Sequence, residues 1–377
     1  MGLVSAMNKP ISVLMVSVRA DHGGGPRHIE LLLKHLPADI QPFVACPDEP
    51  PFRERFERLT GGRVFTLPHR RFDLGYARRL ARWAGKQGVD LIHAHGKGAG
   101  VYARIVAALI RKPCVHTPHG VHVVQYSPMK RCLYRAYENV TARWVDHLIF
   151  VSDEEHAASQ AAGLWPRTPH SVIVNGVESV TDAQRARWRQ DYRRRLELDD
   201  SQPLIMTLSR FDYQKNMSEA FEVARRLPDA QFAWIGDGEE SALLADRARE
   251  EGVSNIRFLG RIDAPLPWLA AADGYLSTSR WEGLPLAVLE AMSLGVAVVA
   301  SDVTGHRAIE GEGAAMLYPL GDSEAAAERL RALLDDPRLR RETGERGRRL
   351  QRERYSAEGM AAATAGVYRQ VLEVAAR

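Results

Sequence analysis

Short apolar runs alternate with helical patterns along most of this chain of 377 residues, and this alternation occurs in two successive series. In the first series, apolar runs such as Val13–Val18 and Leu91–Ala94 are separated by amphipathic stretches such as Ala99–Ile110. Strands that alternate with helices favour parallel βαβ units, in which helices cover both faces of a sheet. The sequence therefore predicts an α/β protein with doubly wound parallel sheets.

A polar, arginine-rich stretch from Glu178 to Asp200 interrupts the alternation, which begins again after Pro203. A chain of this length also exceeds the size at which one hydrophobic core usually stops growing. We therefore expect two domains with a linker and a terminal helix, at residues 1–176 (first domain), 177–202 (linker), 203–357 (second domain) and 358–377 (C-terminal helix).

The composition is that of an ordinary globular protein, with 45% hydrophobic and 26% charged residues. The three cysteines are widely spaced and form no Cys-x-x-Cys pair, which favours a reducing compartment and argues against structural zinc. No apolar run approaches the roughly 20 residues that a membrane-spanning helix needs. We therefore expect a cytoplasmic protein.

Charge is unevenly distributed along the chain. Residues 1–175 contain 23 lysines and arginines against 14 aspartates and glutamates, whereas the remainder contains 28 against 33. A basic first half suits an acidic partner, such as anionic lipid, a phosphate-linked acceptor or nucleic acid. Basic residues scattered over solvated faces are an equally good interpretation.

Segment 277–301 contains two carboxylates, Glu282 and Glu290, which lie eight positions apart around a predicted helix start. Pro285 suits the first turn of that helix, and Gly295 suits its end. The carboxylates are suited to accept hydrogen bonds from the hydroxyls of a sugar or a ribose. Unpaired backbone N–H groups at the helix start favour an anion, and they belong to Gly283, Leu284 and Leu286.

Two loops that follow predicted strands carry residues suited to bind phosphate. Arg210 and Lys215 lie five positions apart after the apolar run Leu204–Leu208. A bidentate arginine and a mobile lysine together suit a diphosphate. In the other loop, Gly24 and Gly25 allow a ligand to approach the backbone closely. That loop lacks the Gly-x-Gly-x-x-Gly pattern, which argues against a dinucleotide site.

Five histidines raise the question of a metal site, namely His93, His95, His116, His119 and His122. They follow different strands, and none forms the helical pair with a carboxylate that zinc hydrolases use. His93 and His116 suit strand interiors, as structural histidines. The chain also lacks the Gly-x-Ser-x-Gly nucleophile elbow of serine hydrolases. We therefore expect no catalytic metal and no hydrolase.

The segment Ser-x-x-Glu-Gly-Leu-Pro-Leu-x-x-Leu-Glu-Ala-Met, followed by a glycine and a valine-rich strand, resembles the E-x7-E segment of retaining GT-B glycosyltransferases of family 4. The resemblance covers nearly the whole chain. It implies two Rossmann-like domains facing a central cleft, with the acceptor bound by the first domain and the nucleotide sugar by the second. It also implies that the C-terminal helix crosses back to the first domain.

The resemblance assigns roles to individual residues. Glu282 would bind hydroxyls of the donor sugar, and Glu290 would bind the ribose. The expected catalytic set is Glu282, His119, Arg210 and Lys215, with the last two holding the diphosphate and His119 contacting the sugar. The further expected contacts are Gly24, Gly260, Arg261, Ile262, Gly283, Leu284, Pro285 and Leu286 on the donor side, and Gly25, His95 and Lys97 on the acceptor side.

The implied reaction is the retaining transfer of a hexose-type sugar from a nucleotide-diphosphate sugar, with UDP favoured, to a glycan or lipid-linked glycan. Such transfer belongs to cell-surface polysaccharide or lipopolysaccharide synthesis. We expect no cofactor and no nucleic-acid partner. Three alternatives stay open: a nucleotide-sugar 2-epimerase of the same fold, a soluble transferase that makes a small metabolite, and a non-catalytic sugar-nucleotide-binding protein.

Basic and apolar residues are interleaved in one segment of the first domain. Three basic residues lie next to three apolar or aromatic ones in this segment, namely Lys130, Arg131 and Arg135 next to Leu133, Tyr134 and Tyr137. Such a helix can rest on an anionic membrane, at the inner face of the cytoplasmic membrane. An ordinary helix with one solvated face is an equally good interpretation.

Overall fold

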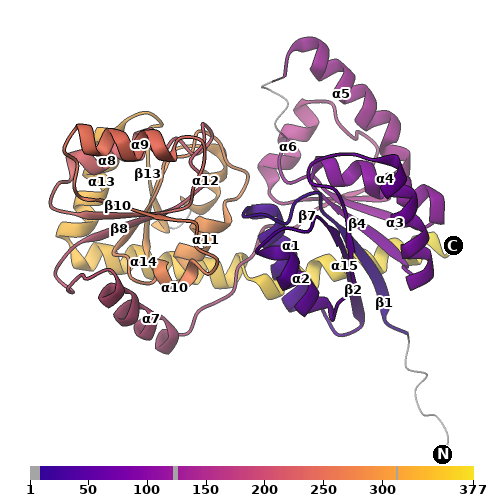
Figure 1. Ribbon diagram of the computed structural model, residues 1–377, viewed down its shortest axis with the longest axis horizontal. Coiled ribbons are helices and arrows are strands. Elements are labelled where there is room, and N and C mark those ends of the chain that lie inside the picture. The colour runs from indigo at the N-terminus through magenta and orange to yellow at the C-terminus, as the bar shows by residue number, and fades with distance from the viewer. Residues whose placement is uncertain (1–8, 122–125, 311–312) are drawn as a thin grey trace, which may run out of the picture. The chain divides into compact units, whose positions relative to one another are not determined.

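The computed structural model describes residues 9–121, 126–310 and 313–377 (Figure 1). The chain forms two compact units. Unit 1 is made of Met1–Val174 and Ala357–Arg377, and unit 2 of Asn175–Ser356. Both ends of the chain therefore contribute to unit 1.

Unit 1 is built on a seven-stranded parallel sheet with the strand order β3-β2-β1-β4-β5-β6-β7. Its strands are β1 (Ile11–Val16), β2 (Ile40–Cys46), β3 (Val64–Thr66), β4 (Leu91–His95), β5 (Cys114–Thr117), β6 (His147–Phe150) and β7 (His170–Val172). Its helices are α1 (Gly24–His35), α2 (Phe52–Thr60), α3 (Leu74–Gln87), α4 (Lys97–Ile110), α5 (Pro128–Thr141), the 3-10 helix η1 (Ala142–Trp144), α6 (Asp153–Ala161) and α15 (Ala357–Ala375).

The strands of unit 1 are apolar because both faces of their sheet are covered. One buried cluster joins β1, β2 and β4 to α3 and α4, whereas α1 packs against α2 and α15. The strand order reverses between β1 and β4. In open α/β sheets, ligands bind beyond the carboxyl ends of the strands at such a reversal.

Unit 2 is built on a six-stranded parallel sheet with the strand order β10-β9-β8-β11-β12-β13. Its strands are β8 (Leu204–Leu208), β9 (Gln231–Ile235), β10 (Ile256–Gly260), β11 (Gly274–Ser277), β12 (Ala297–Ser301) and β13 (Ala315–Tyr318). Its helices are α7 (Asp182–Arg195), α8 (Met217–Arg226), α9 (Ser241–Glu250), α10 (Leu266–Leu269), α11 (Leu286–Ser293), α12 (Thr304–Glu310), α13 (Ser323–Asp335) and α14 (Pro337–Arg354).

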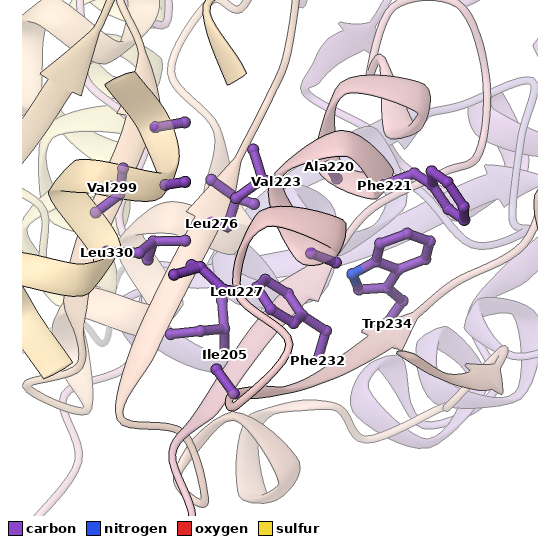
Figure 2. Packing of buried hydrophobic residues seen from close by; sticks show 14 of the residues in the cluster. Ile205, Ala220, Phe221, Val223, Leu227, Phe232, Trp234, Leu276, Val299 and Leu330 are labelled. Carbon is purple, nitrogen blue, oxygen red and sulfur yellow. The ribbon is translucent and has the colours of Figure 1, made fainter. Parts of the chain in front are cut away.

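The core of unit 2 fills the space between its sheet and the helices α8 and α13. Figure 2 shows Phe221 of α8 beside Trp234 of β9, with Leu330 of α13 close to Leu276 of β11. The strand order of this sheet reverses between β8 and β11. The sheet therefore offers a second place for a ligand, at the carboxyl ends of these two strands.

The stretch expected as a linker, 177–202, is instead part of unit 2 and contains α7. Two arginines hold this helix, because Arg189 and Arg193 ion-pair with Asp273 at 2.7 and 3.2 Å. Asp273 also accepts a hydrogen bond from the backbone N–H of Leu204, at the start of β8. Charge pairing rather than an apolar face thus attaches α7 to the sheet.

Other differences from the expected elements are small. The short strand β3 was not expected, and β7, which ends at Val172, begins at His170, two residues before the apolar run Val172–Val174 that predicts a strand in this region. Pro285 directly precedes the first residue of α11 instead of lying within its first turn. Among the helices of the described residues, none has an apolar stretch long enough to cross a membrane.

Candidate active site

The loops that follow β8 and β11 lie together where the strand order of unit 2 reverses. The hydroxyl of Thr278 donates to the carbonyl of Lys215 at 2.9 Å. Gln214 donates from its side-chain amide to the backbone carbonyl of Trp281 at 3.1 Å. The backbone carbonyl of Gln214 accepts from the backbone N–H of Arg280 at 2.8 Å. These contacts hold the basic loop and the glutamate loop as one structure.

Glu282 lies at the centre of this structure. Its Oε1 accepts hydrogen bonds from Lys215 Nζ at 2.5 Å and from Ser279 Oγ at 2.6 Å. Burial raises the pKa of Glu282, but the charges of Lys215 and His306 and the two hydrogen bonds outweigh burial, so the pKa lies below its usual value. Among the described residues, Oε2 has no hydrogen-bond partner. An ionised oxygen therefore remains available to a hydroxyl.

His306 supports the glutamate loop from α12. Its Nδ1 donates to the carbonyl of Ser301 at 2.8 Å, so its Nε2 accepts from the hydroxyl of Ser277 at 3.1 Å. Burial lowers the pKa of His306 below its usual value, although the neighbouring charge of Glu282 opposes this shift. At Gly305, a Cβ atom would lie 2.3 Å from the carbonyl oxygen of Gly283. Only glycine allows α12 to approach the loop this closely.

Arg210 and Lys215 direct their charges to different carboxylates. Arg210 Nη2 pairs with Asp212 Oδ2 at 3.0 Å and also donates to Gln214 at 3.2 Å. The other oxygen of Asp212 accepts from the backbone N–H of Lys215 at 3.2 Å. Asp212, which the sequence analysis missed, therefore fixes the turn that presents both cations.

Glu290 lies on α11 and is buried. Burial raises the pKa of Tyr275, and Glu282 and Glu290 raise it further, so both carboxylates act on the region around this hydroxyl. A pocket lies between the loops that follow β8 and β11, and Glu290 is not among the residues that line it. That pocket is lined by Thr207, Leu208, Ser209, Lys215, Tyr275, Ser277, Thr278, Ser279, Glu282, Pro285, Ala287 and Val288.

The expected donor contacts on Gly283, Leu284 and Leu286 belong to the same loop and helix start. Those on Gly260, Arg261 and Ile262 lie at the end of β10 and just after it.

The end of β9 brings the β10 contacts close to the basic loop. The carbonyl of Gly260 accepts from the N–H of Gly236 at 2.8 Å, and Arg261 pairs with Asp237 at 3.2 Å. A Cβ atom at Gly236 would lie 1.7 Å from the carbonyl oxygen of Ser209. The sequence analysis missed this glycine, although Gly-Asp-Gly directly after a predicted strand was a signal for a close backbone approach.

In unit 1, the expected site residues lie beyond the carboxyl ends of β1, β4 and β5. His95 Nδ1 and His119 Nε2 are 3.2 Å apart, within hydrogen-bonding distance. His28 of α1, which the sequence analysis missed, has its ring centroid 4.7 Å from that of His119. Burial lowers the pKa values of His95 and His119, which keeps these rings neutral.

The other candidate histidines of unit 1 have different surroundings from His28, His95 and His119. Both ring nitrogens of His93 are engaged, by the hydroxyls of Tyr368 at 2.7 Å and Thr117 at 2.8 Å, as expected of a structural histidine. His116 lies 3.4 Å from a guanidinium nitrogen of Arg104. His122 lies outside the described residues.

A buried glutamate supports the turn that carries His119. His119 has a φ of 55°, and the N–H of the following Gly120 donates to Glu155 Oε1. Glu155 Oε2 accepts from Val151 N at 2.8 Å. The sequence analysis missed Glu155, although the pattern Ser-x-x-Glu that begins at Ser152 is a signal for a helix start.

The remaining expected residues of unit 1 lie at helix starts. Gly24 and Gly25 begin α1, and a Cβ atom at either position would meet nothing within 4 Å. Lys97 begins α4, and its Nζ lies 3.4 Å from the hydroxyl of Tyr126. The two glycines therefore face open space, as close approach of a ligand requires.

Two known families match this chain. The family described as glycosyl transferases group 1 matches residues 189–350, which include the glutamate and basic loops. The family described as glycosyltransferase family 4 matches residues 22–180, which include the three histidines. The two matches together take in both candidate sites.

Relatives and solved structures agree with these matches. The chain is 28% identical to the Bacillus subtilis protein EpsD over 307 residues, which is 76% of this chain and 79% of EpsD. It is 28% identical over 265 residues to an Escherichia coli UDP-Gal:α-D-GlcNAc-diphosphoundecaprenol α-1,3-galactosyltransferase, covering 67% of this chain and 68% of the relative. The structure of Anabaena HepE in complex with UDP-glucose matches with a TM-score of 0.83 at 20% identity, covering 96% of this chain and all of HepE.

The likeness to HepE establishes the fold, and the family matches establish the class. The chain has the GT-B fold and consists of a family 4 glycosyltransferase domain followed by a group 1 glycosyltransferase domain.

Proposed function

We propose that this protein transfers a hexose-type sugar, with retention of anomeric configuration, from a UDP-sugar to a glycan or lipid-linked glycan of the cell surface. The observation that carries the proposal is Glu282, held ionised by Lys215 and Ser279 at the reversal of the unit 2 sheet. UDP is favoured because HepE binds UDP-glucose and the Escherichia coli relative is named for a UDP-sugar. The same relative is named for a lipid-linked acceptor.

The proposed chemistry uses the residues of the site as follows. Oε2 of Glu282 accepts a hydroxyl of the donor sugar, and Glu290 binds the ribose. Arg210 and Lys215 bind the diphosphate, together with N–H groups at the start of α11, so that no metal is needed. The bond from the anomeric carbon to the diphosphate breaks, and the acceptor oxygen bonds to that carbon on the same face. The proton of the acceptor hydroxyl passes to the leaving diphosphate, and His119 contacts the sugar.

The first test is a thermal-shift panel with UDP, GDP, ADP and CMP. At about 100 times its dissociation constant, a bound nucleotide adds about 2.7 kcal/mol of stability. We expect UDP to stabilise the protein selectively, and Arg210→Ala and Glu290→Ala to weaken this effect. Glu342→Gln serves as a matched control, because Glu342 forms an exposed ion pair with Arg338 on α14. Absence of stabilisation by any nucleotide would remove the main support of the proposal.

Product analysis separates the alternatives once a donor is known. A transferase yields a glycoside whose anomeric configuration can be read by NMR, with retention expected and no loss of rate in EDTA. A 2-epimerase converts the donor to its epimer without an acceptor. A non-catalytic binding protein gives nucleotide-dependent stabilisation and no product.

We also propose that α5 places the enzyme on an anionic membrane surface, where a lipid-linked acceptor resides. Four exposed apolar residues, Met129, Leu133, Tyr137 and Val140, follow one another at intervals of three or four positions on this helix. At 3.6 residues per turn they fall within an arc of about 80°. They form what we call the α5 stripe.

The charge around the α5 stripe complements an anionic surface. Lys130, Arg131, Arg135 and Arg143 are all exposed. Glu138, the acid of this segment, is buried and paired with Arg104 at 2.5 Å, so it does not offset their charge at the surface. At 3.6 residues per turn, Lys130 lies beside the stripe and Arg131 and Arg135 lie on the opposite face of α5. An apolar face combined with a basic polar face is the pattern of helices that lie in a membrane interface.

Co-sedimentation with phosphatidylglycerol vesicles tests this placement. We expect salt-sensitive binding that Leu133→Glu abolishes. Leu243→Glu is the matched control, since Leu243 is as exposed as Leu133, at 68% against 65%, but lies on α9 of unit 2. Equal binding of the two variants, or no binding of the wild type, would contradict a role for α5.

A further inference from the structure

Three histidines of unit 1 converge from three separate elements. His28 lies on α1, His95 ends β4 and His119 follows β5. One ring nitrogen of each lies within 4.8 Å of the corresponding nitrogens of the other two. The ring centroids of His28 and His95 are 5.5 Å apart, and so are those of His95 and His119. We call this group the histidine triad.

The triad offers nitrogen lone pairs. Like charges at such short separations oppose protonation of the group, and neutral imidazole is the form that binds metals. The neighbouring His93 lies outside the triad, and hydroxyls engage both of its ring nitrogens.

One of the three nitrogen pairs already has the spacing that a tetrahedral metal requires. Zinc–nitrogen bonds of about 2.0–2.1 Å place two ligand nitrogens roughly 3.3 Å apart, and His95 Nδ1 and His119 Nε2 are already 3.2 Å apart. Three nitrogen ligands without a carboxylate suit Zn²⁺, Cu²⁺ or Ni²⁺ rather than Mg²⁺ or Ca²⁺. His119 is partly exposed, which gives an ion access and leaves a fourth position for water.

We propose that the histidine triad is a binding site for Zn²⁺ and that the bound ion inhibits the enzyme. Inhibition follows because the ion takes the nitrogen of His119 that would otherwise contact the sugar. This second part rests on the proposed function, whereas the binding of zinc does not. The ion is an inhibitor here and takes no part in glycosyl transfer.

Metal titration of the full-length protein tests the site directly. After dialysis against a chelator, we expect one Zn²⁺ per chain in a competition titration with a chromophoric chelator. Co²⁺ in its place should give the visible absorption bands of a tetrahedral nitrogen site. We expect His28→Gln and His119→Gln each to weaken Zn²⁺ binding at least tenfold, with folding checked by circular dichroism.

His156→Gln provides the matched control. His156 belongs to another histidine pair of unit 1, with its ring centroid 4.2 Å from that of His170, and should leave Zn²⁺ affinity unchanged. No saturable binding by the wild type, or equal binding by His28→Gln and the wild type, would overturn the proposal. Using His28→Gln alongside His119→Gln separates loss of the ion site from loss of a residue placed at the sugar.

The two proposals fail in different measurements. Zinc binding is measured without a nucleotide, and stabilisation by UDP is measured in chelator. Zinc binding without UDP stabilisation would contradict the proposed function alone. UDP stabilisation without zinc binding would contradict the zinc site alone. If both are observed, Zn²⁺ should slow transfer by the wild type, and full activity with saturating Zn²⁺ would overturn the inhibitory role.

Discussion

Among single residues, Glu282 combines a nearly buried carboxylate with two hydrogen-bond donors, Lys215 and Ser279. Its side chain is 7% exposed and carries its charge because Lys215 and Ser279 hold it. A hydrogen bond to a charged group contributes about 1.5–3 kcal/mol. We expect Glu282→Gln to lower the free energy of unfolding at pH 7 by about this amount.

The pH dependence of that loss follows from the direction of the pKa shift. The folded pKa of Glu282 lies below the ordinary value of 4.5. The ionised group therefore stabilises the fold above pH 4.5, and this contribution disappears as the pH falls through the folded pKa. Urea denaturation should show the difference between wild type and Glu282→Gln narrowing below pH 4.5. A difference that stays constant down to pH 3 would contradict the shift.

Two glycines give a second prediction at the residue scale. Gly236 has a φ of 133° and faces the carbonyl of Ser209, whereas a Cβ atom at Gly366 within α15 would meet nothing within 4 Å. We expect Gly236→Ala to displace the basic loop and abolish UDP binding. Gly366→Ala should raise stability by up to about 1 kcal/mol. Calorimetry on both variants checks this, and normal UDP affinity in Gly236→Ala would contradict the close packing.

The sequence predicted which residue types gather at the unit 2 site but not their pairing. Arg210 and Lys215 were expected to act as a pair because they share a loop, and the structure gives them different partners, Asp212 and Glu282. Pairing depends on side-chain directions across two loops, which spacing along one chain does not encode. For the same reason, His28 was missed, since only the fold brings α1 beside β4 and β5.

Among the elements, α5 has an exposed apolar stripe on one side and a buried ion pair to α4 on another. Arg104 and Glu138 form a buried ion pair between α4 and α5, and Trp165 Nε1 donates to the same carboxylate oxygen at 3.0 Å. Loss of one member of a buried pair typically costs about 3–5 kcal/mol. We expect Glu138→Gln to destabilise the protein by about this amount in urea denaturation.

A double variant shows whether this loss comes from an uncompensated charge. Replacing both members of a buried pair by apolar residues is often nearly neutral. We therefore expect Arg104→Met combined with Glu138→Leu to recover most of the stability that Glu138→Gln loses. A double variant less stable than the single one would show that the pair itself, rather than the unpaired charge, carries the stability.

The sequence predicted well those strands that are buried along their whole length. It predicted poorly the elements that are very short or that are attached to the fold by ion pairs. The strands β8 and β12 are covered on both faces, so they read as apolar runs and were found almost to the residue. The strand β3 has three residues, none of them buried, and gave no such run. The helix α7 has no apolar face, and its attachment through Asp273 requires knowledge of β11.

For the whole molecule, the two units are separate compact bodies with their own cores. We expect UDP to protect unit 2 alone. In hydrogen-exchange mass spectrometry, saturating UDP should slow exchange in β8 and β11 and leave β1 and β4 unchanged, because the residues proposed to bind its ribose and diphosphate, Glu290, Arg210 and Lys215, belong to unit 2. Equal protection of both sheets would contradict a nucleotide site confined to unit 2.

Because both ends of the chain form unit 1, the two units are completed out of order during translation. The ribosome finishes β1 to β7 first, then makes all of unit 2, and only afterwards makes α15. At roughly 5–20 residues per second, the intervening 175–356 take on the order of 10–40 s. Throughout that interval the nascent unit 1 lacks Tyr368, the partner of His93, and the helix that covers α1. Unit 1 therefore receives its last helix only after every residue of unit 2 has been made.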